Sequence, residues 1–74
     1  MMIRKLTVGN DYKNAMNYVV NQEVLGGKYK INYIQVNDID RSVTVWIINE
    51  TREVVAWKKF SKDMPISIEY NIEF

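Results

Sequence analysis

The run from residue 43 to residue 60 constrains the fold more than any other part of the chain. It reads VTVWIINETREVVAWKKF, two apolar stretches on either side of the polar residues 49–52. β-Branched and aromatic side chains fit strands better than helix turns, and a short polar connection between two such stretches is typical of a hairpin. We therefore predict antiparallel strands over residues 43–49 and 53–60.

Three further strands are predicted from the same preference. Isoleucine and valine occur nine times each and leucine only twice, which favours sheet over helix. Alternation with a period of two begins after Gly26-Gly27 in KYKINYIQV and is unbroken in ISIEYNIEF at the end of the sequence. The predicted strands cover residues 2–8, 28–36 and 66–74.

Between the first two of these strands the apolar residues follow a helical spacing. Asn10 or Asp11 can cap a helix N-terminus, and Gly26-Gly27 can end a helix because glycine adopts a positive φ at little cost. We expect an amphipathic helix of about fourteen residues in this segment. Its apolar side consists of Tyr12, Ala15, Met16, Val19, Val20 and Val24.

Together these elements predict one α+β domain spanning residues 1–74. The order of elements is β-α-β-β-β-β, an antiparallel sheet of about five strands with the amphipathic helix packed on one face. Which strand pairs with residues 2–8 is left open.

The two tryptophans of the hairpin fall on opposite faces of the predicted sheet. Alternation places Trp57 beneath the helix with Val45 and Ile47, and it places Trp46 on the other face. A helix is about 10–12 Å across whereas five strands span about 24 Å, so the second face stays uncovered. Exposed apolar patches of several hundred Å² usually mark interaction sites. We predict partner binding by Ile34, Val36, Trp46, Ile48, Val54 and Ala56.

On the strand at 28–36 the same alternation puts Tyr29, Ile31 and Tyr33 beneath the helix. An alternative arrangement is a strongly curled sheet, which buries the side bearing Trp46 against the terminal strand or a loop.

Catalysis and metal binding have little support in the residue types present. The chain has no cysteine and no histidine, which removes disulfides, the common zinc sites and the usual nucleophile–base pairs. Asp38 and Asp40 lack the spacing of a calcium loop and fit turn chemistry instead. We expect no enzyme activity, no cofactor and no metal. Because neither a secretory leader nor an apolar run of membrane-spanning length is evident, the expected location is the cytoplasm.

Lysines beside aromatic residues offer an alternative function, since single-strand nucleic-acid binders combine a basic groove with aromatic platforms. A formal net charge of only +1 argues against a strong nucleic-acid field. Glu69 and Glu73 can also neutralise the lysines across strands. The residues of this alternative are Lys28, Lys30, Tyr33, Lys58, Lys59 and Lys62.

The opening MIRKLTVGNDYKNAMNYVV and the closing MPISIEYNIEF resemble the uncharacterised small accessory proteins of large tailed phages. The resemblance carries no motif of known chemistry, so no functional residue follows from it. It implies a phage accessory protein in the host cytoplasm that binds a host protein and modulates or inhibits it.

The predicted function is a small non-enzymatic protein-interaction module. A domain of this size buries only about 60–65% of the surface that its unfolded chain exposes, so small domains often gain stability from association. We expect a homodimer through the face bearing Trp46, or docking of that face on a larger protein. Pairing through an exposed edge strand is the alternative mode of association.

Overall fold

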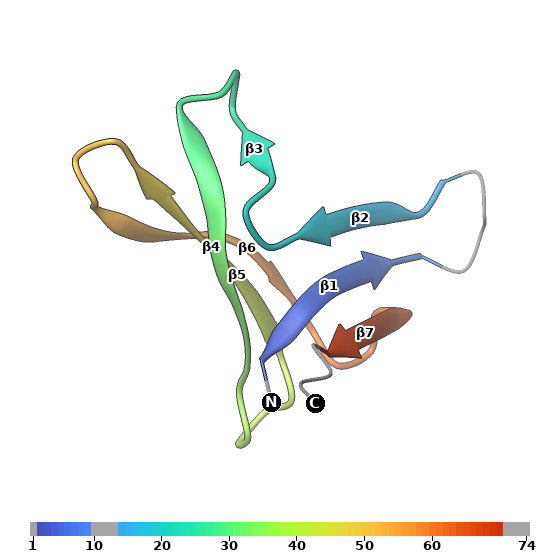
Figure 1. Cartoon of the computed structure of the whole chain (residues 1–74). Coiled ribbons are helices and arrows are strands. Elements are labelled where there is room, and N and C mark those ends of the chain that lie inside the picture. Colours follow the sequence, from blue (N-terminus) through green and yellow to red (C-terminus); the bar gives the residue numbers. More distant parts are fainter. Residues whose placement is uncertain (1, 10–13, 71–74) are drawn as a thin grey trace, which may run out of the picture.

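The computed structural model describes residues 2–9 and 14–70 of the chain. Within these residues the backbone forms seven strands and no helix, and every strand pairing is antiparallel (Figure 1). The strands are β1 (Ile3–Val8), β2 (Met16–Val19), β3 (Glu23–Val24), β4 (Tyr29–Val36), β5 (Val43–Asn49), β6 (Val54–Phe60) and β7 (Ile66–Tyr70).

The first sheet brings together the two ends of the described chain in the order β2-β1-β7. In its central strand, Leu6 lies opposite Tyr18 of β2 and Ile68 of β7. The Gly9 N–H donates to the Pro65 carbonyl at 2.8 Å, one bond beyond the β1–β7 ladder. The first strand of the chain therefore pairs with both its successor and the last strand.

The second sheet has the order β3-β4-β5-β6. Its long strands are connected as a meander, and the β5–β6 turn is closed by bonds between Asn49 and Glu53. The Asn49 N–H donates to the Glu53 carbonyl at 3.1 Å, and the Asn49 Oδ1 accepts from the Glu53 N–H at 2.9 Å. β3 has only two residues and pairs with the beginning of β4.

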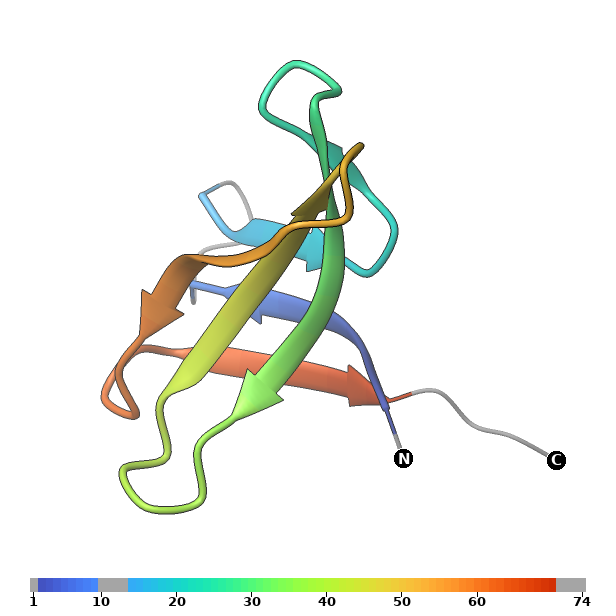
Figure 2. The same cartoon turned by 90° about the vertical axis from the view of Figure 1, so that its left-hand side faces the viewer.

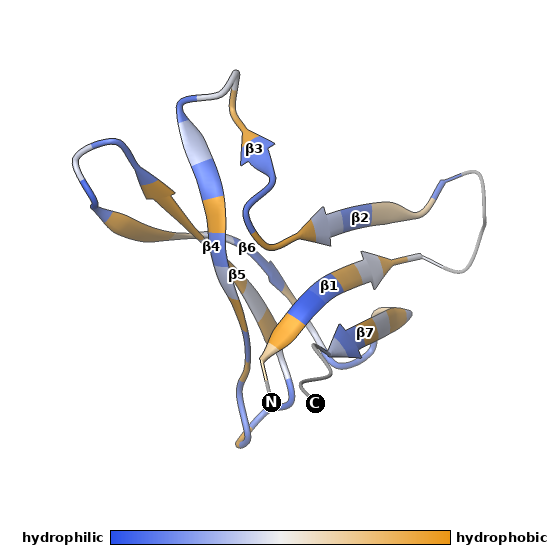
Figure 3. Ribbon diagram, in the orientation of Figure 1, coloured by the Kyte–Doolittle hydropathy of each residue, from blue (hydrophilic) through white to orange (hydrophobic). Residues whose placement is uncertain are grey.

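The two sheets pack face to face, and their strands cross in projection (Figure 2). Hydrophobic and hydrophilic residues are interspersed along β1 and β4, as expected for strands with one face in the core (Figure 3). The turn that leads from β2 of the first sheet to β3 of the second is bonded to β4, since the Asn21 N–H donates to the Ile31 carbonyl at 2.8 Å. The buried core consists of Leu6, Val8, Tyr18, Ile31, Ile34, Val43, Val45 and Ile47.

The predicted helix is wrong. In the described part of that segment, Met16–Val19 form β2 and Glu23–Val24 form β3. Residues 10–13 lie outside the described residues. The described fold is therefore all-β with two antiparallel sheets, not α+β with one five-stranded sheet and a helix.

A strand replaces the helix because the apolar residues of this segment fit both periods. Met16, Tyr18 and Val20 alternate, and pairing with β1 buries Tyr18 to 7% exposure although the helical spacing omitted it. Asn21 and Leu25 have φ values of 75° and 54°. A right-handed helix cannot contain such left-handed residues, which L-amino acids adopt singly in turns.

The strand positions agree with the sequence prediction more closely. Residues 43–49 form β5 as predicted, and β1, β4 and β6 each begin one residue after the predicted start. Residues 66–70 of the predicted last strand form β7, and residues 71–74 lie outside the described residues.

Candidate interaction surface

A bulge in β4 decides which aromatic side chains share a face. Ile31 lies opposite Ile47, and Tyr33 lies opposite Trp46, so the β4–β5 register shifts by one residue at Asn32. A bulge inserts one unpaired residue and changes the facing of everything beyond it. Tyr33 therefore lies on the outer face of the sheet and not beneath a covering layer, which corrects the sequence prediction.

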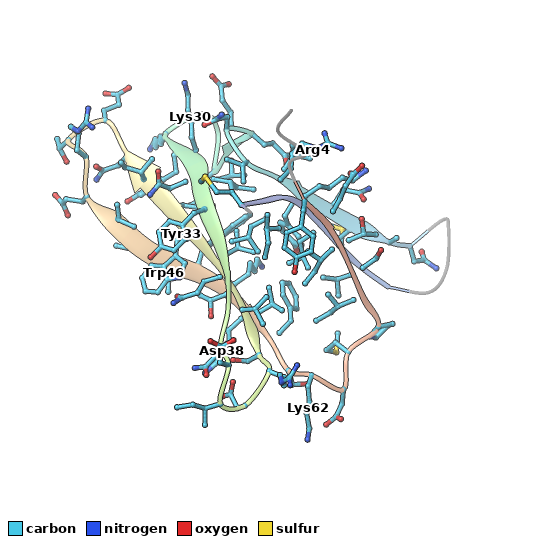
Figure 4. All side chains as sticks on the ribbon, turned by 60° about the horizontal axis from the view of Figure 1, so that its bottom comes forward. Arg4, Lys30, Tyr33, Asp38, Trp46 and Lys62 are labelled. Atoms are coloured by element: carbon cyan, nitrogen blue, oxygen red, sulfur yellow. The ribbon has the colours of Figure 1, made fainter. Side chains whose placement is uncertain are left out.

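Tyr33 and Trp46 form a stacked pair on that outer face. Their ring centroids are 5.6 Å apart and their planes differ by 10°. The Trp46 indole Nε1–H donates to Gln35 Oε1 at 3.1 Å, which fixes the ring from a second side. Figure 4 shows both aromatic side chains together beside β4. Aromatic pairs of this kind contribute about 0.5–1.5 kcal/mol beyond the area they bury.

The register extends this pair into a contiguous surface, which we call the Trp46 face. Directly opposite residues of an antiparallel pair point to the same side, so each row crosses β4, β5 and β6. The outer sheet face faces away from β1, β2 and β7, whose sheet covers the inner side. The Trp46 face consists of Lys30, Tyr33, Gln35, Thr44, Trp46, Ile48, Val54, Ala56 and Lys59.

Four of the six predicted partner-binding residues lie on the Trp46 face: Trp46, Ile48, Val54 and Ala56. The placement of the other two on this face is wrong. Ile34 is a core residue with 6% exposure, and Val36 packs against the core. The cause is the bulge, since a strand without an extra residue would carry Tyr33 inward and Ile34 outward.

Trp57 faces the interior, so the two tryptophans lie on opposite sides of the sheet as predicted. Its ring meets the Tyr18 ring edge-on, with centroids 5.8 Å apart and planes at 82°. Burial raises the pKa of the Tyr18 hydroxyl. A second register shift lies between Val45 and Trp46, where Val45 pairs with Lys58 and Trp46 with Ala56.

Half of the residues proposed for nucleic-acid binding converge on the Trp46 face: Lys30, Tyr33 and Lys59. The other three lie elsewhere. Lys28 is in the turn before β4, Lys62 is in the turn after β6, and the Lys58 ammonium lies 5.2 Å from the Trp57 ring centroid.

Two acidic residues bear on the charge of this region. Glu23 of β3 lies directly opposite Lys30, where it reduces the positive potential at that corner of the face. Glu69 forms an ion pair with Arg4 across β1 and β7, so its charge is engaged there and not with a lysine of the second sheet. Glu73 lies outside the described residues.

In the β4–β5 loop, which contains Asp38 and Asp40, side chains form the hydrogen bonds that are typical of turns. Asp40 Oδ1 accepts from the Ser42 hydroxyl at 2.6 Å and from the Ser42 N–H at 2.9 Å. These bonds, the side-chain one foremost, lower the pKa of the Asp40 carboxyl. Asn37 Oδ1 accepts from the Ile39 N–H at 2.8 Å in the same loop. Within residues 2–9 and 14–70, no three acidic, cysteine or histidine side chains cluster as metal ligands.

Comparison with family models, curated proteins and solved structures finds no match to this chain. In the described part of the chain no helix has the length and apolarity needed to cross a membrane.

Sequence reasoning missed Tyr33 and Gln35 as neighbours of Trp46. The adjacent apolar residues Tyr33 and Ile34 interrupt the alternation in KINYIQV, but they do not by themselves show that Asn32 is the bulged residue. A usable cue is the pair Ile31 and Ile34. They are three positions apart, so both can face the core only if the strand contains one extra residue between them.

Proposed function

We propose that this chain is a non-enzymatic protein-interaction module that forms a homodimer through the Trp46 face. The observation that carries the proposal is the stacked Tyr33–Trp46 pair, placed on the side of the sheet that the other sheet does not cover. Tryptophan and tyrosine are the side chains most enriched at the energetic centres of interfaces.

The composition and size of the face support a modest interface. Three strands at about 4.8 Å spacing and three residue rows give an area of about 300 Å², with Ile48, Val54 and Ala56 beside the aromatic pair. Patches of about 300–600 Å² are often functional on small proteins. Stable interfaces usually bury about 800 Å² on each partner, so the surrounding loops must contribute and the dimer should dissociate on dilution.

A two-fold arrangement fits this surface because the same patch would meet itself. Trp46 lies in the central row of the central strand, with Tyr33 and Ala56 on either side. An axis near Trp46 buries the aromatic pairs of both copies in the middle, whereas Lys30 and Lys59 at the corners stay hydrated on the rim.

Light scattering over a dilution series tests the dimer. The wild-type chain should change from a dimer to a monomer as it is diluted, and Trp46→Glu should stay a folded monomer throughout because it buries a charge in the interface. Ser67→Glu, on an exposed position of β7, is the matched control and should dimerise like the wild type. A wild-type monomer at every concentration, or a dimeric Trp46→Glu variant, contradicts the proposal.

A single-stranded nucleic acid is the second candidate ligand, and the bulge at Asn32 is the observation that favours it. This bulge brings Tyr33 to the face of Lys30 and Trp46, and the register shift between β5 and β6 adds Lys59. Together they form the combination of aromatic platform and cations that such ligands use. A single-stranded oligothymidine should quench Trp46 fluorescence, and Lys30→Ala with Lys59→Ala should abolish the quenching, whereas Lys5→Ala should not. The absence of quenching at low salt rules this candidate out.

The resemblance to phage accessory proteins supports a host protein in the bacterial cytoplasm as a further partner of the same face. Retention of one host protein from a bacterial lysate by the wild-type chain, and its loss with Trp46→Glu bait, is the expected result. Equal retention by both baits would place any such contact on another surface.

A further inference from the structure

A groove of about 610 Å³ opens between the second half of β4 and the adjoining ends of β1 and β7. Its volume lies within the roughly 300–1,000 Å³ range of ligand sites. The rim residues Met2 and Tyr70 are 63% and 47% exposed, so the groove is accessible from solvent. The groove is lined by Met2, Ile3 and Tyr70 and by residues 32–36 of β4.

One wall of this groove is a strand edge that lacks a neighbour in the described chain. β3 pairs only with Tyr29 and Lys30, and the next residue, Ile31, exchanges backbone bonds with Asn21 and Gln22 at 2.8 and 2.9 Å. Beyond Ile31 no described strand pairs with this side of β4. Among the described residues, the edge is therefore open over residues 32–36, all of which line the groove.

The direction of the free backbone groups follows from the bonds at both ends of this stretch. Ile31 directs its N–H and carbonyl away from β5, and the Asn37 N–H donates toward β5, to the Ser42 carbonyl at 2.8 Å. Backbone groups alternate between the two edges of a strand in an antiparallel ladder. With the bulge at Asn32, the groups of Ile34 and Val36 therefore point into the groove.

We propose that this groove binds an extended, uncharged apolar segment of a partner protein as an additional strand on β4. The N–H and carbonyl groups of Ile34 and Val36 supply the ladder bonds, and Met2, Ile3 and Tyr70 receive the alternate side chains. The composition of the site selects this occupant, since its described lining contains no Asp, Glu, Lys or Arg side chain and a charged segment would lose hydration without a counter-charge. The site adjoins the Trp46 face, since Tyr33 and Gln35 belong to both, but its ladder bonds come from the backbone groups of Ile34 and Val36.

Amide hydrogen exchange, followed by nuclear magnetic resonance, tests the groove directly. In the free protein the Ile34 and Val36 amides should exchange quickly, whereas those of Tyr33 and Gln35, directed toward β5, should exchange slowly. The probe is the capped pentapeptide Thr-Val-Thr-Val-Thr at millimolar concentration. Exchange at Ile34 and Val36 should slow by a factor of 1 + [L]/Kd, about tenfold at ten times the Kd. Unchanged exchange at both amides overturns the proposal.

Two controls separate strand addition from simple apolar contact. The same peptide N-methylated at both valines cannot form the ladder bonds and should leave exchange unchanged. Tyr70→Glu places a charge in the lining and should weaken peptide protection at least tenfold, whereas Glu69→Gln, on the opposite face of β7, should not. Equal protection by the methylated peptide, or by the Tyr70→Glu variant, contradicts strand addition in this groove.

The free protein also reports on other occupants. If the Ile34 and Val36 amides are slow without peptide and become fast in a chain ending at Tyr70, the groove belongs to residues 71–74 and the partner proposal fails. If they are slow only at high protein concentration, a second copy occupies the edge and the proposal also fails. Val54→Glu, which places a charge on the Trp46 face away from the groove lining, should bind the peptide like the wild type, so failure of the dimer and failure of the groove are distinguishable.

Discussion

The two faces of the sheet formed by β4, β5 and β6 carry similar residues, but one face is buried in the core and the other is not covered by the second sheet. Ile47 and Ile48 are neighbours in the sequence and identical in type, yet Ile47 is 2% exposed in the core and Ile48 lies half-buried on the Trp46 face. The inner face meets a second sheet, and the outer face meets none in the described chain. Whether a residue lies in the core or on the outer face follows from the alternation of side chains along its strand, and each bulge shifts that alternation by one residue.

The largest expected effect on folding comes from single-residue deletions, which change the face that each later side chain of a strand takes. Deletion of Thr44 from β5 turns either Val43 or the residues beyond it to the wrong face, so we expect loss of the folded state. Deletion of Asn32 removes only the bulged residue and leaves Ile31 inward and Tyr33 outward, so this variant should stay folded at a cost of about 1 kcal/mol. Circular dichroism and urea unfolding measure both.

The difference in stability between these two deletion variants shows whether the bulged residue and a regular strand residue have different roles. If the Asn32 deletion unfolds the chain as completely as the Thr44 deletion, the bulge does more than set the facing of Tyr33. If the Thr44 deletion stays folded, the register of β5 is not held by its buried residues.

The isoleucine pair gives the next largest effect. Ile47→Ala removes a buried side chain and leaves a cavity, with an expected loss of about 2–5 kcal/mol in the free energy of unfolding. Ile48→Ala removes the same atoms from the outer face and should cost about 1 kcal/mol or less in the monomer. Urea unfolding at low protein concentration makes this comparison. Equal losses at the two positions would mean that the outer face is as well packed as the core.

The strands could be predicted from the sequence because their local preferences agree with their burial. Residues 43–49 and 54–60 combine β-branched residues with a polar turn, and the tertiary structure agrees with this local preference for strands. The segment around Tyr18 failed because its apolar residues fit a helical and a strand period equally. Pairing with β1 decided between them, and that contact is not local.

The Trp46 face was predictable only in part, because some of its residues depend on non-local contacts. Trp46, Ile48, Val54 and Ala56 follow from simple alternation on β5 and β6. Tyr33 depends on one extra residue in β4, which the core selects by burying both Ile31 and Ile34. The free edge beside Ile34 depends on β3 being only two residues long, which no residue of β4 reveals.

The aromatic pair provides a smaller and more specific test of the outer face. A double-mutant cycle with Tyr33→Leu and Trp46→Leu should give a coupling of about 0.5–1.5 kcal/mol, because the stacked rings interact beyond their individual burial. The control cycle combines Tyr33→Leu with Trp57→Leu, whose ring lies on the other side of the sheet and should couple by less than about 0.5 kcal/mol. Urea unfolding supplies all the free energies. Equal coupling in both cycles would contradict a direct stack.

The smallest expected effect lies at the end of the same sheet, in the loop that joins β4 to β5. The two hydrogen bonds from Ser42 hold the pKa of Asp40 below its usual range, so the folded state binds this proton less readily than the unfolded chain. The resulting stabilisation is fully present above the unfolded pKa of about 4 and is lost as the pH falls through the lower folded value. Asp40→Asn keeps an acceptor for Ser42 but cannot titrate, so its urea midpoint should fall less than that of the wild type between pH 7 and pH 3. Identical pH profiles would show that the carboxylate charge of Asp40 contributes nothing to the stability of the loop, and that its two bonds with Ser42 act as neutral hydrogen bonds do.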